Sequence, residues 1–471
     1  MNKTKIVATI GPSSQEKETL KQLILSGMNV ARLNLSYATH DFCDEIIDKI
    51  HELNEELNTS VAVMLDLDGP TVTVGKLIEQ KIYLKKGNLI QIYGKERVGD
   101  DKTISVNYPN LVKDMKYNSH IVLGDNEVLL TVIDKEEDCL TCKIEEDAIL
   151  KENMKLISLD CSLQLPFLTE KDKEDILYAH EKNVDFIALS FVTSSENILE
   201  VNDLLINLND DRLSILAKIE TEEAVEEIDE IIRVADGILV ARGDLGVALP
   251  MERIPGIQKM IISKCHRQGK VSVVATEMLG SMEFTSHPTR AEVSDVANAV
   301  LDGVDAVMLS GETTIGDYPV ETLSMMAKII ESSEDDIDYR DLLDKAMRTE
   351  KNDITGSLAY SVTDNAERLR CTAIVAPTIT GYTAKKISRF RPVCPIIALS
   401  PDEAVVKSLA LHFGVYGFQV TELNSFDKVM RQATESLKEF MEIKEGDKII
   451  VTGGYPFKEV KHTNFMRIEE L

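Results

Sequence analysis

The sequence predicts an α/β protein, built as a (β/α)8 TIM barrel with an inserted β-rich domain and a C-terminal α/β domain. Three observations support this fold class. Eight apolar segments of strand type alternate with amphipathic helices, and polar residues follow nearly every one of those segments. The alternation breaks once, where a long stretch of short β segments interrupts it.

The eight barrel strands are predicted from short apolar runs that end in polar residues. They begin at residues 5, 30, 61, 186, 214, 237, 271 and 306. Helices with one apolar face are predicted over residues 15–25, 40–57, 169–182, 195–208, 222–235, 251–268, 289–301 and 320–332. Eight consecutive strand–helix units are the number that closes such a barrel, whose active site lies at the carboxyl ends of its strands.

The insertion and the C-terminal part differ from the barrel in their order of strands and helices. Residues 69–165 contain short β segments broken by glycines and no long helix, so we expect the barrel to comprise residues 1–68 and 166–340. Residues 341–471 return to an α/β pattern. Its predicted strands cover 372–376, 395–399, 415–420 and 448–452, and its predicted helices cover 357–368, 383–390, 402–413 and 426–440.

Composition excludes several classes of function. The 471 residues carry a formal net charge of -28, which repels nucleic acid and anionic membrane surfaces. No apolar run approaches the roughly 18 residues of a membrane span. Seven cysteines without paired spacing are typical of reduced thiols, which predicts a cytoplasmic protein. An anionic ligand would need local positive charge in its site.

The fifth and sixth predicted strands carry the most informative charges. The fifth ends in Lys218 and Glu220, and the sixth ends in Arg242 and Asp244. Because a helix joins them, the strands should be parallel, with both charged ends on one side of the sheet. Glu220 and Asp244 would then suit a hard divalent cation, and Lys218 would suit a phosphate or an enolate oxygen. Salt bridges at strand ends are the alternative for a single such unit.

Polar residues at the other strand ends favour a site over isolated salt bridges. On the second strand, Arg32, Asn34 and Ser36 occupy alternate positions and therefore share one face. The complete set of polar strand ends is Arg32, Asn34, Ser36, Asp66, Ser190, Lys218, Glu220, Arg242, Asp244, Thr276, Ser310, Glu312 and Thr313. Seven of the eight strands contribute, which predicts an active site at this end of the barrel.

A second candidate site follows the first strand of the C-terminal part. Residues 377–383 form a hydroxyl-rich turn before a predicted helix and include Thr378, Thr380, Gly381 and Thr383. Backbone N–H groups and the helix dipole at such a turn can hold a phosphate. Capping of the helix by Thr378 or Thr380 is an equally good interpretation.

Several segments resemble the pyruvate kinase family. The matching segments are TKIVATIGPSS at 4–14, GMNVARLNLS at 27–36, LPFLTEKD at 165–172, AKIE at 217–220, ADGILVARGDLGV at 235–247, PTRAEVSDVANAVLDGVDAVMLSGETTIGDYPVE at 288–321 and TNFMRI at 463–468. They are spread over nearly the whole chain, and the segment at 288–321 is too long to match by chance. The resemblance implies a barrel, an inserted β-rich lid and a C-terminal α/β domain.

The resemblance also implies a reaction, phosphoryl transfer from phosphoenolpyruvate to ADP, giving pyruvate and ATP in glycolysis. Glu220 and Asp244 would hold Mg²⁺ or Mn²⁺. Lys218 and Arg32 would contact the phosphoryl group, and Thr276 would lie near the carbon that is protonated when the enolate becomes pyruvate. The substrate carboxylate would meet the backbone of residues 242–244, including Gly243, at a helix N-terminus.

Further ligands follow from the same resemblance. Residues that match the K⁺ ligands are Asn34, Ser36, Asp66 and Leu67, the last through its backbone carbonyl. Residues that match the nucleotide site are Arg32, Asn34 and Lys155. The turn with Thr378, Thr380, Gly381 and Thr383 would be the loop for a sugar-phosphate effector. A homotetramer is expected on the same basis.

The chain departs from the family pattern after its third strand. Asp68 stands where the family has lysine, Thr71 where it has glutamate, and Thr73 where it has arginine. These changes remove positive charge from the phosphate-binding side and leave two functions open. The first is a working pyruvate kinase. The second is a metal-dependent lyase or decarboxylase acting on a keto-acid enolate, or a metabolite-binding homologue that no longer phosphorylates ADP.

Overall fold

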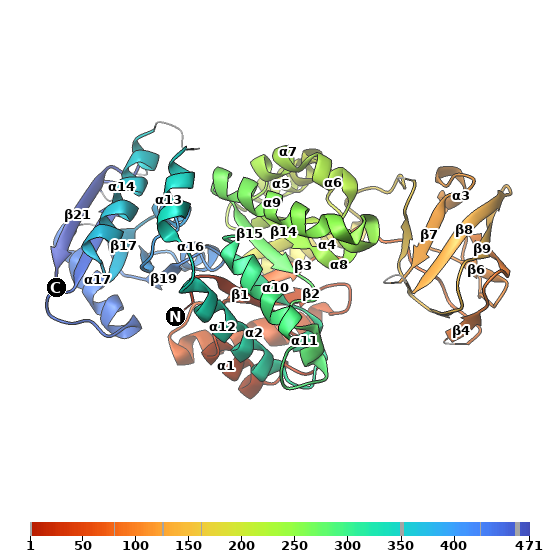
Figure 1. The fold of residues 1–471 in the computed structure, drawn as a ribbon, viewed down its shortest axis with the longest axis horizontal. Helices are drawn as coiled ribbons and strands as arrows, with labels where there is room; N and C mark the ends of the chain where they lie inside the picture. Colours follow the sequence, from red (N-terminus) through yellow and green to blue (C-terminus); the bar gives the residue numbers. More distant parts are fainter. Residues whose placement is uncertain are drawn as a thin grey trace.

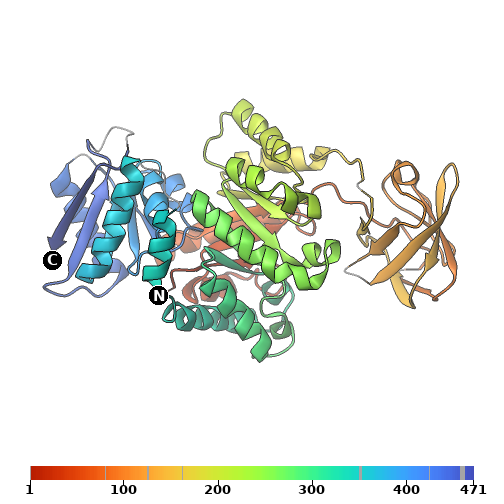
Figure 2. The same ribbon diagram turned by 45° about the horizontal axis from the view of Figure 1, so that its top comes forward.

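The computed structural model describes residues 2–79, 81–124, 127–161, 163–348, 353–423, 425–456 and 462–471. The described residues form three parts arranged in a row, with the barrel in the middle (Figure 1). The inserted β-rich part lies at one end of the barrel and the C-terminal α/β part at the other. The turned view in Figure 2 shows the same order. The two ends of the barrel therefore face different neighbours.

Eight parallel strands close the barrel, which confirms the predicted fold class. They are β1 (Lys5–Thr9), β2 (Val30–Asn34), β3 (Ala62–Asp66), β12 (Phe186–Leu189), β13 (Ser214–Ile219), β14 (Gly237–Ala241), β15 (Val271–Ala275) and β16 (Ala306–Leu309). Their order around the barrel is β1-β16-β15-β14-β13-β12-β3-β2. Alternation of buried residues explains the arrangement: Val7 packs inside the barrel, while Ile6 and Ala8 pack against the surrounding helices.

Helices cover the outside of the barrel. The long ones are α1 (Lys17–Leu25), α2 (His40–Leu57), α4 (Glu170–Glu181), α5 (Ser195–Leu208), α9 (Ile254–Gln268), α10 (Arg290–Leu301) and α12 (Pro319–Glu334). Thr169 and Thr289 begin α4 and α10 with capping boxes, in which the threonine side chain accepts a backbone N–H and a carboxylate three residues later accepts the N–H of the threonine. Short helices α8 (Arg242–Ala248) and α11 (Gly311–Thr314) follow β14 and β16 directly.

The helix predicted over residues 222–235 is wrong as a single helix. It is divided into α6 (Glu222–Glu226) and α7 (Ile228–Val234). Glu227 lies between them with φ of -89° and ψ of 11°, outside helical geometry. The break lets Ile228 and Ile231 of α7 be buried against the core. The helix predicted from residue 251 likewise starts with a short 3₁₀ turn, η1 (Met251–Arg253), and a further 3₁₀ turn, η2 (Gly280–Glu283), follows β15.

The inserted part consists of β-sheets around its own apolar core. Its elements are β4 (Lys81–Leu84), β5 (Leu89–Tyr93), β6 (Thr103–Ser105), α3 (Leu111–Asp114), β7 (His120–Leu123), β8 (Val128–Lys135), β9 (Cys139–Ile144), β10 (Ala148–Lys151) and β11 (Leu156–Ser158). Six of the strands form one sheet in the order β11-β7-β8-β9-β5-β6, and β10 pairs with β4. This part enters after β3 and leaves before α4, so it joins the barrel at the carboxyl ends of the strands.

The C-terminal part is a five-stranded sheet with helices. Its strands are β17 (Ala373–Pro377), β18 (Ile396–Ser400), β19 (Val415–Gln419), β20 (Lys448–Gly453) and β21 (Phe465–Glu470), in the order β19-β18-β17-β20-β21. Its helices are α13 (Tyr339–Arg348), α14 (Ile354–Leu369), α15 (Tyr382–Ser388), α16 (Glu403–Ser408) and α17 (Phe426–Phe440).

Two features of this part differ from the sequence-based expectation. The helix expected over residues 402–413 ends early, since α16 stops at Ser408 and a turn follows in which Leu411 and Phe413 are buried. The final strand β21 was not expected. It pairs antiparallel with β20 and covers the sheet edge, which explains why a mostly exposed segment is a strand. No helix among the described residues is long and apolar enough to cross a membrane.

Candidate active site

The Lys218 ammonium lies at the carboxyl ends of the barrel strands, surrounded by acceptors. Its Nζ donates to Ser190 Oγ at 2.7 Å and lies 3.2 Å from Asp66 Oδ1 and 3.0 Å from Glu220 Oε1. The three N–H groups of the ammonium thus match three acceptors. Burial alone would lower the pKa of Lys218, but the Asp66 and Glu220 carboxylates outweigh burial and raise it above its ordinary value. Lys218 is therefore charged and fixed in place.

Arg32 places a second buried cation beside the same aspartate. Its Nε donates to Asp66 Oδ2 at 2.7 Å, its Nη2 lies 2.6 Å from that oxygen, and its Nη1 donates to Thr9 Oγ1 at 2.8 Å. Burial opposes ionisation of Asp66, but the two cations prevail and hold the pKa of Asp66 below its ordinary value. The strands β2, β3 and β13 thus contribute alternating charges to one cluster.

Glu220 and Asp244 form the carboxylate pair predicted from the sequence. Glu220 is 2% exposed, and its Oε2 accepts the Phe191 backbone N–H at 2.7 Å. Burial raises the pKa of Glu220, and the nearby Asp244 charge adds to that effect. Each Glu220 oxygen has one protein partner, so the two carboxylates could also serve as oxygen ligands of a divalent cation.

Thr276 and the residues around it form a strained turn at the end of β15. Thr276 has φ of 73° and Glu277 has φ of 52°. A positive φ is unusual for a β-branched residue and persists only where neighbours hold it. The Arg242 guanidinium does so, because it donates to the Thr276 carbonyl at 2.6 Å and to the Ala275 carbonyl at 3.2 Å. A Cβ on Gly243 would lie 2.8 Å from Thr276 Cγ2, so this position requires glycine.

The residues that match the K⁺ ligands lie along the ends of β2 and β3. Asn34 Oδ1 accepts the Ser36 backbone N–H at 3.1 Å, and the Leu67 carbonyl accepts a hydrogen bond from Ser190 Oγ at 2.7 Å. Ser36 Oγ donates to Asp68 Oδ1 at 2.7 Å. The Asp68 carboxylate thus adds negative charge beside the oxygens of Asn34, Ser36 and Leu67.

One residue of the inserted part reaches the barrel mouth. The Lys155 ammonium lies 5.6 Å from the centroid of the Phe191 ring, and the Phe191 backbone binds Glu220. Lys155 also forms an antiparallel bridge with Thr73. Lys155 therefore lies beside Thr73, the position at which the family pattern has an arginine that this chain lacks.

Comparison with known proteins identifies the family of the chain. Residues 1–323 match the family model described as "Pyruvate kinase, barrel domain", and residues 356–469 match "Pyruvate kinase, alpha/beta domain". The chain belongs to the pyruvate kinase family. This confirms the resemblance drawn from the sequence motifs.

Full-length relatives support the same assignment. The pyruvate kinase of Sporosarcina psychrophila is 41% identical over 470 residues, which cover 99% of this chain and 80% of that protein. The pyruvate kinase of Clostridium perfringens strain 13 is 39% identical over 474 residues, with all of both chains covered. A crystal structure of a pyruvate kinase from Cryptosporidium parvum has a TM-score of 0.93 at 34% identity and covers 100% of this chain and 96% of that one.

The structure does not bring every predicted site residue of this pyruvate kinase family member to the barrel mouth. Thr378, Thr380 and Gly381 lie between β17 and α15 in the C-terminal part, and Thr383 is in the first turn of α15. Gly381, with φ of 76°, is the N-cap of α15, and no side chain caps that helix, so capping by Thr378 or Thr380 is wrong. Binding of a sugar-phosphate effector at this loop and assembly as a homotetramer stay predictions.

Sequence reasoning missed three groups that contact the site. Thr9 binds Arg32, the Phe191 backbone N–H binds Glu220, and Lys171 Nζ lies 3.8 Å from Asp68 Oδ2. Thr9 and Phe191 are at the carboxyl ends of β1 and β12, where the strand-end argument applies to them as well. Lys171 is on α4, and only the closure of the barrel places it beside Asp68.

Proposed function

We propose that this chain transfers the phosphoryl group of phosphoenolpyruvate to ADP, giving pyruvate and ATP. The observation that carries the proposal is the Lys218 ammonium held between Asp66 and Glu220 at the barrel mouth. This cluster occurs in a chain whose whole length matches pyruvate kinases. Phosphoryl transfer is catalysed mainly by positioning and by neutralising charge, which is what buried cations at the mouth can do.

Lys218 and Arg32 would bind the phosphoryl oxygens. All three N–H groups of the Lys218 ammonium already have acceptors within the protein. Binding of a phosphoryl oxygen to Lys218 therefore requires that one of these acceptors be displaced. Glu220 is the partner we expect to be exchanged, because it is also the proposed metal ligand. Arg32 keeps Asp66 ionised and stays in place through Thr9, so its charge remains aimed at the mouth.

Glu220 and Asp244 fit Mg²⁺ or Mn²⁺. Two carboxylates with free lone pairs are typical of Mg²⁺ sites that leave coordination positions to substrate and water. When bound, the metal would supply positive charge for the enolate and phosphoryl oxygens. Monovalent K⁺ would lie by the oxygens of Asn34, Ser36 and Leu67.

The strained turn would orient the organic part of the substrate. The Arg242 guanidinium is already engaged, because its Nη1 binds Asp295 Oδ2 at 2.6 Å. The backbone of residues 242–244 is therefore the part of this segment that would receive the carboxylate. Close contact of Gly243 with Thr276 brings the threonine hydroxyl to the same place. We infer that Thr276 helps to direct a proton to the enolate carbon.

The residues expected to bind the nucleotide bear on the choice between the kinase and the second function, enolate chemistry without ADP. Loss of arginine at Thr73 favours a homologue that retains enolate chemistry without ADP. The position of Lys155 favours the kinase, because its backbone pairs with that of Thr73 and its ammonium lies 5.6 Å from the centroid of the Phe191 ring at the barrel mouth. The kinase is therefore the function that the geometry supports best.

The deciding experiment measures pyruvate formation from phosphoenolpyruvate by the purified chain, with and without ADP, in Mg²⁺ and K⁺. We expect turnover that requires ADP and that is lost in Lys218→Met. Lys264→Met, which alters a lysine of α9 that lies away from the barrel mouth and pairs with Asp229 at 2.7 Å, is the matched control and should retain most of the turnover. Absence of ADP-dependent turnover across nucleotides, cations and sugar phosphates would reject the kinase. Oxaloacetate decarboxylation would then be measured.

A further inference from the structure

Ser190 is the neutral side chain among the three acceptors of the Lys218 ammonium. It follows β12 directly and is 4% exposed. Its Oγ accepts a hydrogen bond from Lys218 Nζ at 2.7 Å, while Asp66 and Glu220 supply the two charged acceptors. Ser190 is not among the residues expected to bind substrate, metal or nucleotide. Its contact with Lys218 therefore has another purpose.

A second hydrogen bond of Ser190 fixes the direction of the first. Ser190 Oγ donates to the Leu67 carbonyl at 2.7 Å, and Asp66 Oδ1, at 3.5 Å, is a much weaker alternative acceptor. A hydroxyl has one hydrogen and two lone pairs, so the hydrogen points to Leu67 and a lone pair points to Lys218. The Lys218 ammonium, the Ser190 hydroxyl and the Leu67 carbonyl thus form a chain of hydrogen bonds with one polarity.

Packing of the loop after β3 holds Ser190 in this position. Gly69 has φ of 72°, and a Cβ placed on it would lie 2.9 Å from Ser190 Cβ. The Gly69 backbone N–H donates to Oδ1 of the buried Asp172, on α4, at 3.0 Å. The close approach of Gly69 is therefore supported from α4 and leaves Ser190 little freedom to move. Ser190 gives a rigid contact to Lys218, whose four-carbon side chain is flexible by itself.

The next residue aligns the Glu220 carboxylate from the same turn. Phe191 has φ of 55°, which is unusual for a bulky residue and persists only where neighbours hold it. Its backbone N–H donates to Glu220 Oε2 at 2.7 Å. Two consecutive residues therefore contact both members of the Lys218–Glu220 ion pair, whose charged atoms are 3.0 Å apart. The turn of Ser190 and Phe191 thus determines where this cation and this carboxylate lie relative to each other.

We propose that Ser190 is a positioning residue whose hydroxyl holds the Lys218 ammonium in place for phosphoryl transfer, a role that rests on the proposed function. A phosphoryl oxygen displaces one acceptor of Lys218, and Glu220 is the acceptor expected to leave, so Ser190 and Asp66 continue to hold the ammonium. A neutral acceptor does so without cancelling the positive charge that the phosphoryl group needs. Loss of the hydroxyl leaves substrate binding largely intact but misplaces that charge during transfer.

The kinetic test is Ser190→Ala, measured by pyruvate formation at saturating ADP. We expect kcat to fall roughly 10- to 100-fold, the scale of a misplaced catalytic group, while KM for phosphoenolpyruvate changes less than about threefold. Ser190→Cys has a similar shape but only a weak hydrogen-bonding group, so it should behave like Ser190→Ala. Ser388→Ala is the matched control, because Ser388 is 2% exposed and donates to the Phe413 carbonyl at 2.7 Å in the C-terminal part. It loses a buried hydrogen bond of the same kind and should keep the parent kcat.

An NMR measurement tests the same contact without turnover. In the full-length chain with isotope-labelled lysine ammonium nitrogens, the signal that is missing from Lys218→Met identifies Lys218. We expect Ser190→Ala to shift or broaden this signal, because one N–H group of the ammonium loses its acceptor, and Ser388→Ala to leave it unchanged. If the parent chain forms no pyruvate, the proposed function fails, and the signal still shows whether Ser190 positions Lys218. An unchanged Lys218 signal, a parent-like kcat in Ser190→Ala or Ser190→Cys, or an equal loss in Ser388→Ala would overturn the proposal.

Discussion

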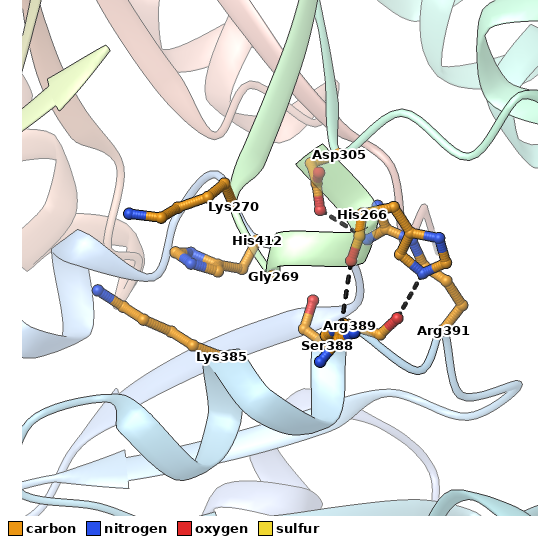
Figure 3. Close-up of a pocket in the computed structure, with 9 residues that line it drawn as sticks. All are labelled: His266, Gly269, Lys270, Asp305, Lys385, Ser388, Arg389, Arg391 and His412. Atoms are coloured by element: carbon orange, nitrogen blue, oxygen red, sulfur yellow. Dashed lines mark hydrogen bonds and ion pairs between the residues drawn. The ribbon is translucent and has the colours of Figure 1, made fainter. Parts of the chain in front are cut away.

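The two ends of the barrel both contain buried charge, but they balance it differently. At the mouth, Arg32 and Lys218 alternate with Asp66 and Glu220, and every contact joins opposite charges within 3.2 Å. At the contact between the barrel and the C-terminal part, a small pocket that we call the junction pocket is lined by Lys270, Asp305, Lys385, Arg391 and His412 (Figure 3). Its arginine–aspartate pair is complete, Lys270 donates to the Ala235 carbonyl, and the Lys385 ammonium has no hydrogen-bond partner among the described residues. The mouth draws its charges from neighbouring strands of one sheet. The junction pocket draws its charges from two separately folded parts, and only their contact brings like charges together.

This difference teaches what the charges do at each end. We expect a substrate at the mouth to replace an existing partner of Lys218, so binding there exchanges one ionic contact for another. At the junction pocket the Arg391–Asp305 pair is complete within the protein and ties the barrel to the C-terminal part. The first arrangement suits a site that must release its product, and the second suits a contact that stabilises the assembled fold.

The largest effect should come from breaking the complete ion pair of the junction pocket. Arg391→Met leaves Asp305 charged and buried, and removing one member of such a pair typically costs about 3–5 kcal/mol. We expect the free energy of unfolding, measured with urea, to fall by that amount while the kcat of the folded enzyme changes less than about twofold. Arg368→Met alters an exposed arginine of the same part and should cost under about 1 kcal/mol. Equal losses in both variants would show that the Asp305 pair is not special.

The same substitution at the mouth should affect catalysis more than stability. Arg32→Met removes a cation aimed at the phosphoryl group, and loss of one such group typically lowers turnover roughly 10²–10³-fold. The measurement is kcat/KM for phosphoenolpyruvate at saturating ADP. Arg253→Met, which breaks an exposed ion pair with Glu222 on the barrel surface, should leave it unchanged. A kcat/KM for Arg32→Met within a few-fold of the parent value would remove Arg32 from the phosphoryl site.

The sequence was sufficient for the barrel and for most of the mouth. Strand ends are local: Lys218 and Glu220 are two residues apart on one strand, and parallel pairing carries them to the same end as Asp66. Alternation and strand count therefore predict which residues meet. Thr9 is the register partner of Arg32 on the neighbouring strand, so the strand-end argument could have found it. Lys171 was missed because it is on a helix and reaches Asp68 only through tertiary packing.

The junction pocket could not be predicted from the sequence. Lys270 and Lys385 are separated by more than a hundred residues and belong to different folding units. Each sits at a helix or loop position where an exposed lysine is the ordinary expectation. The early end of α16, which the helical pattern did not indicate, is what places His412 at the pocket. The break at Glu227 in the predicted helix was also not predictable, because tertiary packing and not local helix propensity decides where that helix is divided.

Acid should destabilise the junction more than the mouth. The pKa of His266 is lowered to about 4, by burial first and then by Arg391, and that of His412 to about 3. Between these values and the ordinary 6.5, the unfolded chain binds protons that the folded chain does not, so the stabilisation is full above pH 6.5 and is lost as the pH falls. From pH 7 to pH 5 we expect each of the two histidines to contribute a loss of about 2 kcal/mol to the free energy of unfolding.

The wild type is compared with His412→Asn by urea unfolding at both pH values, which isolates one histidine from other titrating groups. Asp185 is such a group: burial raises the pKa of its carboxyl to about 6, so it acts in the opposite direction. Between pH 7 and pH 5 the variant should lose about 2 kcal/mol less than the wild type. An unchanged pH effect in the variant would mean that His412 titrates normally in the folded chain.

The smallest effect is expected where the inserted part meets the mouth. Lys155→Met removes the ammonium near the Phe191 ring, and we expect kcat/KM for ADP to fall about tenfold, the scale of one charge-assisted hydrogen bond to a phosphate. The KM for phosphoenolpyruvate should change little, because Lys155 lies 5.6 Å from the Phe191 ring and makes no contact with Lys218. The two kinetic constants therefore separate a nucleotide contact from a general loss of activity.

Lys151→Met provides the comparison within the inserted part. Lys151 is four residues earlier in the same region, but its ammonium pairs with Glu127 at 2.9 Å, and the lysine is half exposed. Its loss should leave both constants unchanged. If Lys155→Met behaves like Lys151→Met, the charge missing at Thr73 has no substitute in the inserted part, and the barrel alone would have to bind the nucleotide phosphates. That result would shift the balance between the two proposed functions toward enolate chemistry without ADP.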